Sequence, residues 1–319
     1  MSPSHPYTKA LIACRPAVHP KGERLPTVAD FLSEPGVPFG KHTSTSTNNI
    51  EVPAPKEVML QVENLSVWYP DDKDFFGNVR SYVKAVDDVS FQVYRGETLG
   101  IVGESGCGKS TLGRALLRLI PLTSGTITLN GEDLTNRTEE SLRKLRKDIQ
   151  IVFQDPYSAL NPRLTIASAL AEPVKVHQLI TTGTERRTNV MQWLEKVGLN
   201  AEHRNRYPHE FSGGQRQRIV IARALALNPS FIVCDESVSA LDVSVQAQVL
   251  NLLQDLKREF GFTVLFISHD LSVVHFLSDR IMVMNRGKIE EIGDADQVYH
   301  HPASPYTREL LNSLPGKTA

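Results

Sequence analysis

A glycine-rich stretch of nine residues carries the clearest chemical signal in this sequence. It consists of Gly103, Glu104, Ser105, Gly106, Cys107, Gly108, Lys109, Ser110 and Thr111. Glycines let a backbone wrap closely and aim its N–H groups at phosphate oxygens. Lys109 can reach the β- and γ-phosphates of a nucleotide, and the Ser110 hydroxyl can ligate Mg²⁺. The spacing fits G-x-x-x-x-G-K-[ST], the phosphate-binding loop of nucleoside triphosphatases, and therefore predicts a nucleotide site.

Two carboxylates form a second candidate group. Residues 231–234 are apolar, as in a buried strand, and Asp235 and Glu236 follow directly. Delivered beside the phosphate loop, Asp235 would supply an indirect Mg²⁺ ligand. Glu236, one residue further, could act as general base on the attacking water. The alternative is a strand that ends in two solvated acids, which the phosphate loop elsewhere in the chain disfavours.

A second glycine-rich helix start predicts a partner subunit. Phe211 is followed by Ser212, Gly213, Gly214 and Gln215, which open a predicted helix that ends at residue 225. Such a helix N-terminus can bind an anion. Because the chain already cradles its own nucleotide, the simplest use of a second cradle is to close over the nucleotide of a neighbour. We therefore expect a head-to-tail dimer with two ATP molecules at the interface; the alternative is an ordinary glycine-rich helix cap.

The elements that must position these residues alternate between strand and helix patterns. Period-2 or continuous apolar runs predict strands over residues 58–67, 83–93, 98–102, 125–131, 149–153, 231–235 and 263–267. Helical periodicity covers residues 111–119, 166–176, 188–197, 215–225 and 245–260. The motif Trp68-Tyr69-Pro70 is expected to end the first strand, with a turn over residues 71–80. The alternation predicts a parallel α/β sheet with its ligand at the carboxyl ends of the strands, interrupted by a helical lobe near residues 160–210.

Composition excludes several classes of protein. Of 319 residues, 40% are hydrophobic, and 35 Lys and Arg nearly balance 36 Asp and Glu. This balance gives no electrostatic case for a nucleic-acid partner, and the basic run at residues 143–147 is expected to be a solvated helix face. Three distant cysteines indicate neither a disulfide framework nor a metal site. Cys107 is expected to be a small loop residue; a thiol of lowered pKa is the alternative. No apolar run is long enough to span a membrane.

The first 56 residues differ from the rest. Residues 41–55 have the composition of a flexible linker. Ahead of them, the motif Pro-Tyr-Thr-x-x-Leu at residues 6–11 repeats that at residues 305–310. The repeat is either a chance echo or the closing segment of a second, upstream copy of this domain. The expected organisation is an N-terminal extension and linker over 1–56, an ATPase domain over 57–300 with its helical lobe at about 160–215, and a tail over 301–319.

The chain resembles the ATP-binding cassette (ABC) ATPases. The sequence Ser-Gly-Gly-Gln at residues 212–215, about 20 residues before the Asp235 strand, is similar to the signature of that family, and the likeness runs from about residue 59 to 299. The resemblance implies a P-loop NTPase fold: a RecA-like parallel α/β core, an antiparallel β subdomain and an inserted α-helical signature lobe.

The resemblance also assigns roles to single residues. Tyr69 would stack on adenine, with Trp68 as the alternative one position away, and Gln154 would sense Mg²⁺ and the γ-phosphate. Asp242 closes a loop that faces the partner across the dimer, and His269 would be the switch histidine on the γ-phosphate. The implied Mg²⁺ ligands are Ser110, Gln154 and Asp235, and the implied catalytic group is Glu236, His269, Gln154 and Lys109.

The loop, the residues after Gln154 and the Pro-Tyr-Thr tail resemble importers of dipeptides and oligopeptides. Such relatives pair with a second ABC ATPase subunit and two transmembrane permease subunits, are fed by an extracytoplasmic solute-binding protein, and sit peripherally on the cytoplasmic face of the bacterial inner membrane. Phe211 and Ser237 depart from commoner family residues, and the cysteines are too few for the iron–sulfur tail of some relatives. Import of nickel or another small solute, a non-transport ABC ATPase and an accessory subunit with little turnover remain the alternatives.

Overall fold

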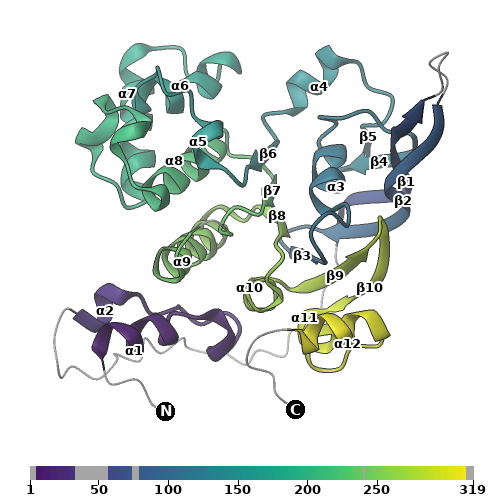
Figure 1. The fold of residues 1–319 in the computed structure, drawn as a ribbon. Helices are drawn as coiled ribbons and strands as arrows, with labels where there is room; N and C mark the ends of the chain where they lie inside the picture. Colours follow the sequence, from purple (N-terminus) through teal and green to yellow (C-terminus); the bar gives the residue numbers. More distant parts are fainter. Residues whose placement is uncertain (1–4, 33–56, 74–78, 240, 314–319) are drawn as a thin grey trace.

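The computed structural model describes residues 5–32, 57–73, 79–239 and 241–313. Two sheets, a helical lobe and two terminal segments make up these residues (Figure 1). Among them, no helix combines the length and the apolar character needed to cross a bilayer.

A six-stranded sheet forms the centre, in the order β10-β9-β3-β8-β7-β6. Its strands are β3 (Thr98–Val102), β6 (Ile149–Val152), β7 (Phe231–Asp235), β8 (Thr263–Ile267), β9 (Arg280–Asn285) and β10 (Lys288–Asp294). All neighbours pair in parallel except β9 and β10. β3, β7 and β8 are buried throughout, as expected for apolar strands covered on both faces. The predicted parallel sheet is therefore confirmed.

A four-stranded antiparallel sheet, in the order β2-β1-β4-β5, lies beside this core. Its strands are β1 (Val58–Lys73), β2 (Val79–Tyr94), β4 (Ser124–Leu129) and β5 (Glu132–Asp133). Helix α3 (Lys109–Leu116) packs between the sheets, and one apolar cluster joins Val62 and Val86 of the antiparallel sheet to Ile101 and Leu112. The phosphate loop therefore lies at the junction of the two sheets. α3 ends at Leu116, earlier than the predicted residue 119, because Arg118 has a left-handed φ of 52°.

The predicted end of the first strand was wrong. β1 does not stop at Trp68-Tyr69-Pro70 but continues to Lys73, and residues 71–73 are strand rather than turn. β1 pairs with β4 only as far as Ser66, whereas its pairing with β2 includes Pro70 opposite Tyr82. Among the residues that the structure describes, this edge of β1 therefore has no paired strand beyond Ser66. A proline, which lacks a backbone donor, is tolerated on such an edge.

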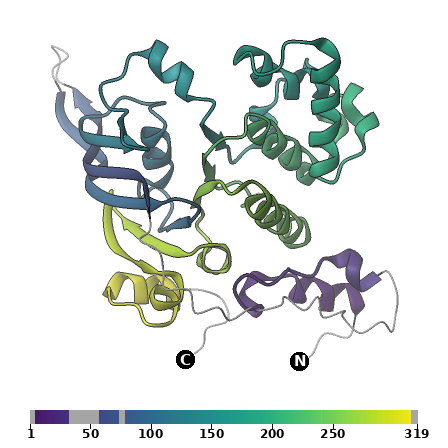
Figure 2. The same cartoon turned by 180° about the vertical axis from the view of Figure 1, so that it is seen from behind.

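The helical lobe extends from the end of β6 and stands apart from the antiparallel sheet in both views (Figures 1 and 2). Its helices are α5 (Pro156–Ala159), α6 (Ile166–Val176), α7 (Gly183–Lys196) and α8 (Gly213–Leu225), with short 3₁₀ turns at Ala201–Asn205 and Pro208–Glu210. α7 begins earlier than the predicted residue 188 because Thr182 caps it, accepting from the Glu185 amide. Trp193 of the lobe stacks on Phe260 at 5.3 Å between ring centroids.

The remaining helices flank the core. They are α4 (Glu139–Leu145), α9 (Val243–Phe260), α10 (Leu271–Leu277), α11 (Ala295–His300) and α12 (Pro305–Asn312). The N-terminal segment forms α1 (Pro6–Ala13), a 3₁₀ turn at Pro16–Val18 and α2 (Val28–Leu32). Figure 2 shows this segment in purple below α9, separate from the yellow C-terminal helices. The proposed linker at residues 41–55 lies outside the described residues.

Candidate functional site

Backbone contacts explain the glycines of the phosphate loop. Gly103 and Gly108 have φ angles of 152° and 107°, a region that side chains disfavour. A Cβ on Gly103 would lie 2.1 Å from the Met284 carbonyl oxygen, and one on Gly108 would lie 2.0 Å from that of Ala85. The loop is therefore clamped between β9 of the parallel sheet and β2 of the antiparallel sheet, and only glycine fits at both contacts.

The ammonium group of Lys109 lies over the loop. Its Nζ donates to the Gly103 and Glu104 carbonyl oxygens at 2.8 Å each and lies 3.7 Å from the Cys107 sulfur. The residue is buried although it carries a charge, so these carbonyl contacts stabilise the ammonium where a phosphate would be gripped. Burial raises the pKa of Cys107. The alternative of a reactive thiol of lowered pKa was therefore wrong, and Cys107 is a small loop residue.

The strand end at Asp235 reaches the loop. The Ser110 hydroxyl donates to the Asp235 carboxylate at 2.6 Å, and Arg114 lies 4.0 Å from the other carboxylate oxygen. Burial raises the pKa of Asp235, although the Ser110 hydrogen bond and the Arg114 charge act in the opposite direction. A hydroxyl and a buried carboxylate in direct contact are hard oxygen donors, which suit Mg²⁺.

Three polar side chains meet at the ends of neighbouring strands. Gln154 follows β6, Glu236 follows β7 and His269 follows β8. The Gln154 Nε2 donates to the Glu236 Oε2 at 2.9 Å, and the His269 Nδ1 lies 3.7 Å from the same oxygen. Parallel strands place their carboxyl ends at one edge of the sheet, so residues far apart in sequence converge there.

The backbone of Glu236 is held in an unusual conformation. Its φ is 47°, a left-handed value that is rare for a residue with a side chain. Its N–H donates to the Ile267 carbonyl at 2.9 Å, which ties the turn after β7 to the end of β8. Strain of this kind persists where the surroundings determine a position, and active sites are common examples.

The serine-glycine motif opens helix α8 on the lobe. Ser212 accepts from the Gln215 amide and Gln215 accepts from the Ser212 amide, which makes a reciprocal capping box. Ser212 and Gly213 are exposed, whereas Gly214 is buried. A Cβ on Gly214 would lie 2.2 Å from a methyl of Val245. The motif therefore presents its first two residues to the outside and uses the third to pack against α9.

Two further predicted residues are also exposed. Asp242 caps α9, accepting from the Val245 amide at 3.0 Å. Tyr69 lies on β1 with its ring exposed, whereas the half-buried Trp68 beside it is covered by the Lys84 ammonium, 4.6 Å from the ring centroid. Of these two aromatic rings, Tyr69 is therefore the more accessible to a ligand.

Comparisons with known proteins show which family this chain belongs to. A family model described as ABC transporter matches residues 86–239, and one described as oligopeptide/dipeptide transporter, C-terminal region, matches residues 1–36 and 291–318. The oligopeptide transport ATP-binding protein OppF of Bacillus subtilis is 53% identical over 260 residues, which are 81% of this chain and 83% of that protein. The chain belongs to the ABC transporter family.

Other relatives extend the match across this ABC chain. The glutathione import ATP-binding protein GsiA of Pectobacterium atrosepticum is 47% identical over 318 residues, 98% of this chain but only 50% of that protein. The chain therefore spans about half the length of GsiA. A dimeric post-hydrolysis structure of the cassette MJ0796, bound to ADP and phosphate, covers 74% of this chain and 99% of its own, at TM-score 0.67 and 30% identity. The structure of cbiO1 from Clostridium perfringens, part of the transporter complex cbiONQ, covers 82% and 97% at TM-score 0.66 and 25% identity.

These findings confirm the predicted P-loop ATPase fold and the prediction of an ATP-hydrolysing ABC importer subunit.

Two residues of this ABC site had not been predicted. Arg114 lies one helical turn after Ser110 and faces the same carboxylate, so the spacing i, i+4 could have revealed it. Tyr306 of α12 has a buried hydroxyl, which raises its pKa, and the Glu104 backbone partly offsets this effect. Nothing in the local sequence signals that contact.

Proposed function

We propose that this ABC subunit binds Mg²⁺-ATP on its phosphate loop and completes the site with the Ser212 motif of a partner cassette. The observation that carries the proposal is the exposure of Ser212 and Gly213 on the lobe, while the phosphate loop is built at the junction of the sheets. One chain therefore offers two half-sites on separate parts of its surface. Gln215 and Asp242 would support the half-site that faces the partner.

Each residue of the hydrolytic half-site has a distinct task. Lys109 and the loop amides neutralise charge on the β- and γ-phosphates. Ser110, Gln154 and Asp235 would hold Mg²⁺, which neutralises charge developing on the phosphates when bound. Glu236 accepts the hydrogen bond of Gln154, and its task is to orient the attacking water. His269, 3.7 Å from Glu236, steadies the γ-phosphate. Tyr69 stacks on adenine.

Hydrolysis then drives transport through partners. Loss of the γ-phosphate removes the charge that both cassettes grip, so the dimer opens. Two transmembrane permease subunits would convert this opening into alternating access, with the cassette docked on the cytoplasmic face of the membrane. We propose peptides as the solute, delivered by an extracytoplasmic binding protein, because OppF and AppF of Bacillus subtilis are named oligopeptide transport proteins at 53% identity. GsiA, named for glutathione import, supports a short peptide equally well.

We also propose that residues 1–56 correspond to the tail and linker of a preceding cassette, and residues 301–319 to the same tail in this one. The support is the match of one family model to residues 1–36 and 291–318. The ATPase domain between them would span residues 57–300.

The decisive experiment is reconstitution in lipid vesicles with a permease pair and a binding protein of the oligopeptide-importer type. Binding protein loaded with a short peptide, glutathione included, is expected to raise ATP hydrolysis, and nickel offered with the same protein to raise it less. If hydrolysis ignores the permeases and every solute, the transport role is excluded and a non-transport ATPase takes its place. If nickel alone stimulates, peptide import is excluded.

A further inference from the structure

The N-terminal segment, residues 5–32, is bound to the cassette in a specific way. The Leu25 amide donates to the Asn251 side chain at 2.9 Å, and the Asn251 amide group donates back to the Leu25 carbonyl at 2.8 Å. Both residues are buried. Arg24 adds an exposed ion pair with Asp255 at 2.8 Å. An asparagine that satisfies one backbone residue in both directions fixes the register of the segment on α9.

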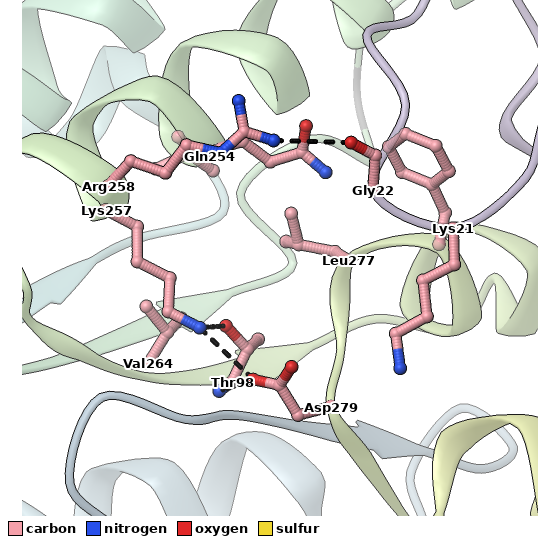
Figure 3. Close-up of a pocket in the computed structure, with 11 residues that line it drawn as sticks. Lys21, Gly22, Thr98, Gln254, Lys257, Arg258, Val264, Leu277 and Asp279 are labelled. Carbon is pink, nitrogen blue, oxygen red and sulfur yellow. Dashed lines mark hydrogen bonds and ion pairs between the residues drawn. The ribbon is translucent and has the colours of Figure 1, made fainter. Parts of the chain in front are cut away.

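Figure 3 shows the neighbouring contact. Arg258 of α9 donates to the Gly22 carbonyl at 3.2 Å, and Lys257 donates to Thr98 at 2.7 Å below it. A cavity of about 240 Å³ lies between the segment and α9. Cys14 belongs to the same apolar cluster as the cassette core. The inner side of the segment is therefore part of the cassette.

Helix α1 and helix α12 share one pattern in one register. α1 begins at Pro6 and α12 at Pro305, and each contains eight residues. After each proline the sequence continues Tyr-Thr-x-x-Leu. Equal starts and equal lengths mean that matching positions point in matching directions on the two helices.

Matching positions nevertheless have opposite exposure. Tyr7 and Ile12 are 49% and 44% exposed, and Thr8 is exposed as well. We call these three residues the outward face of α1. Their counterparts in α12, half-buried or buried against the cassette, are Tyr306, Thr307 and Leu311. The face that α12 buries is therefore the face that α1 presents.

The other side of the helices shows the reverse. Ala10 and Cys14 of the N-terminal segment are fully buried. The corresponding residues of the tail are Glu309 and Ser313, both exposed. The sequences thus differ where α1 has gained a buried side, and agree at Tyr and Thr on the outward face.

We infer that residues 5–32 bridge two cassettes, with the inner side on α9 of this chain and the outward face on a second cassette of the same family. The surface that fits the outward face is the one that α12 occupies here. Glu291 of β10 accepts from the Ala303 and Ser304 amides at 2.8 and 3.1 Å, and Tyr306 lies beside the Glu104 backbone. The inference rests on the proposal that residues 1–56 correspond to a preceding tail.

The segment would then connect this cassette to the phosphate loop of the other one. Its far end would place Tyr7 where Tyr306 lies here, beside a loop glutamate backbone. Its near end is fixed on α9 by Asn251. Such a bridge keeps two cassettes together while their ATP-dependent interface opens.

A helix transplant in the full chain tests the outward face. Five substitutions convert the α12 sequence into that of α1: Arg308→Lys, Glu309→Ala, Leu311→Ile, Asn312→Ala and Ser313→Cys. If the outward face fits this surface, the melting temperature should stay within about 3 °C of the parent, since volume-conserving swaps are tolerated. Leu311→Glu alone should lower it well beyond that. A transplant that melts as low as Leu311→Glu overturns the inference.

The reverse transplant tests the inner side. Five substitutions convert the α1 sequence into that of α12: Lys9→Arg, Ala10→Glu, Ile12→Leu, Ala13→Asn and Cys14→Ser. Hydrogen exchange at the Leu25 amide should accelerate at least tenfold, because a glutamate replaces the fully buried Ala10. Unchanged protection would mean that α1 has no specialised inner side, which also contradicts the bridge.

Binding between molecules is tested with a labelled peptide of residues 5–16 and the Leu311→Glu chain, whose own α12 is loosened. Fluorescence anisotropy should report binding of this peptide and of a Lys9→Glu control, Lys9 being the counterpart of the exposed Arg308. The Ile12→Glu peptide should bind at least tenfold more weakly. Equal binding of all three peptides, or of none, overturns the bridge. These readouts do not depend on ATP turnover, so their failure is distinct from failure of the transport proposal.

Discussion

The side-chain amide of Gln154 donates to the carboxylate of Glu236, with 2.9 Å between Nε2 and Oε2. The two residues come from the ends of adjacent parallel strands, 82 positions apart. The hydrogen bond engages one carboxylate oxygen of Glu236, and the backbone of this residue is itself fixed in a left-handed conformation. Orientation of this kind is what a general base requires.

Glu236→Gln is expected to retain ATP binding and lose steady turnover by about 10²- to 10⁴-fold, the usual contribution of a general base. The neutral amide keeps the shape of the side chain but cannot take a proton from water. ATP should then hold the cassettes together, so sedimentation velocity should detect an ATP-dependent dimer. Glu195→Gln, at an exposed position of α7, is the matched control and should behave as the parent. Equal turnover in Glu236→Gln and parent would remove Glu236 from this role.

Asp235→Asn is expected to separate stability from activity. Because burial raises the pKa of Asp235, the folded chain disfavours the charged carboxylate. The protonated Asp235 carboxyl group therefore contributes to the free energy of unfolding below the ordinary aspartate pKa. This contribution is lost as pH rises through the raised pKa. Asparagine carries no charge, so the variant should melt above the parent at pH 8.

The melting temperatures of Asp235→Asn and the parent should converge as pH falls below the raised pKa. The variant should lose Mg²⁺-dependent ATP hydrolysis at every pH. Melting curves at intervals from pH 8 down to about pH 4, near the ordinary aspartate pKa, measure the first effect. A constant difference between parent and Asp235→Asn across this range would contradict the assigned direction of the pKa.

Two adjacent glycines of the signature should respond differently to alanine. Gly214→Ala places a methyl 2.2 Å from a Val245 methyl and should cost about 1–3 kcal/mol of stability. At Gly213 the nearest atom to a new Cβ is a Leu241 methyl at 3.9 Å, which is ordinary contact. Gly213→Ala should therefore keep the parent melting temperature but weaken ATP-dependent dimerisation.

The pair contains its own control. Adding Val245→Ala should recover stability in Gly214→Ala, because it removes the methyl that clashes. Thermal melts and sedimentation of all four chains give the comparison. Normal dimerisation by Gly213→Ala at saturating ATP would argue that this exposed position does not meet a partner.

Tyr69→Ala should raise the KM for ATP roughly 5- to 100-fold with little change in kcat, since stacking on a base contributes about 1–3 kcal/mol of binding. A ring that stacks on adenine would bind it equally before and during phosphoryl transfer. Tyr82→Ala is the comparison, because Tyr82 is exposed on β2 and lies against Trp68 instead, at 6.2 Å between centroids. A larger effect at Tyr82 would move the adenine contact to the other side of the strand.

The sequence by itself determined the chemistry of the phosphate loop, because Gly103, Lys109 and Ser110 act through a local turn and helix start. It also determined the parallel core, since the buried strands at residues 98–102, 231–235 and 263–267 appear with the predicted bounds. It did not determine where β1 ends, because Pro70 is acceptable only once β4 has left that edge. A local sequence pattern does not specify which strands pair with one another.

Only the tertiary structure decided which distant side chains meet. Gln154, Glu236 and His269 converge because β6, β7 and β8 are neighbours, an order that no single segment specifies. In the same way, the Pro-Tyr-Thr motif begins two helices of eight residues each, and the sequence cannot say which face each buries. The surroundings decide, since α12 has β10 and the phosphate loop beside it, whereas the segment that contains α1 is bonded to α9 through Leu25.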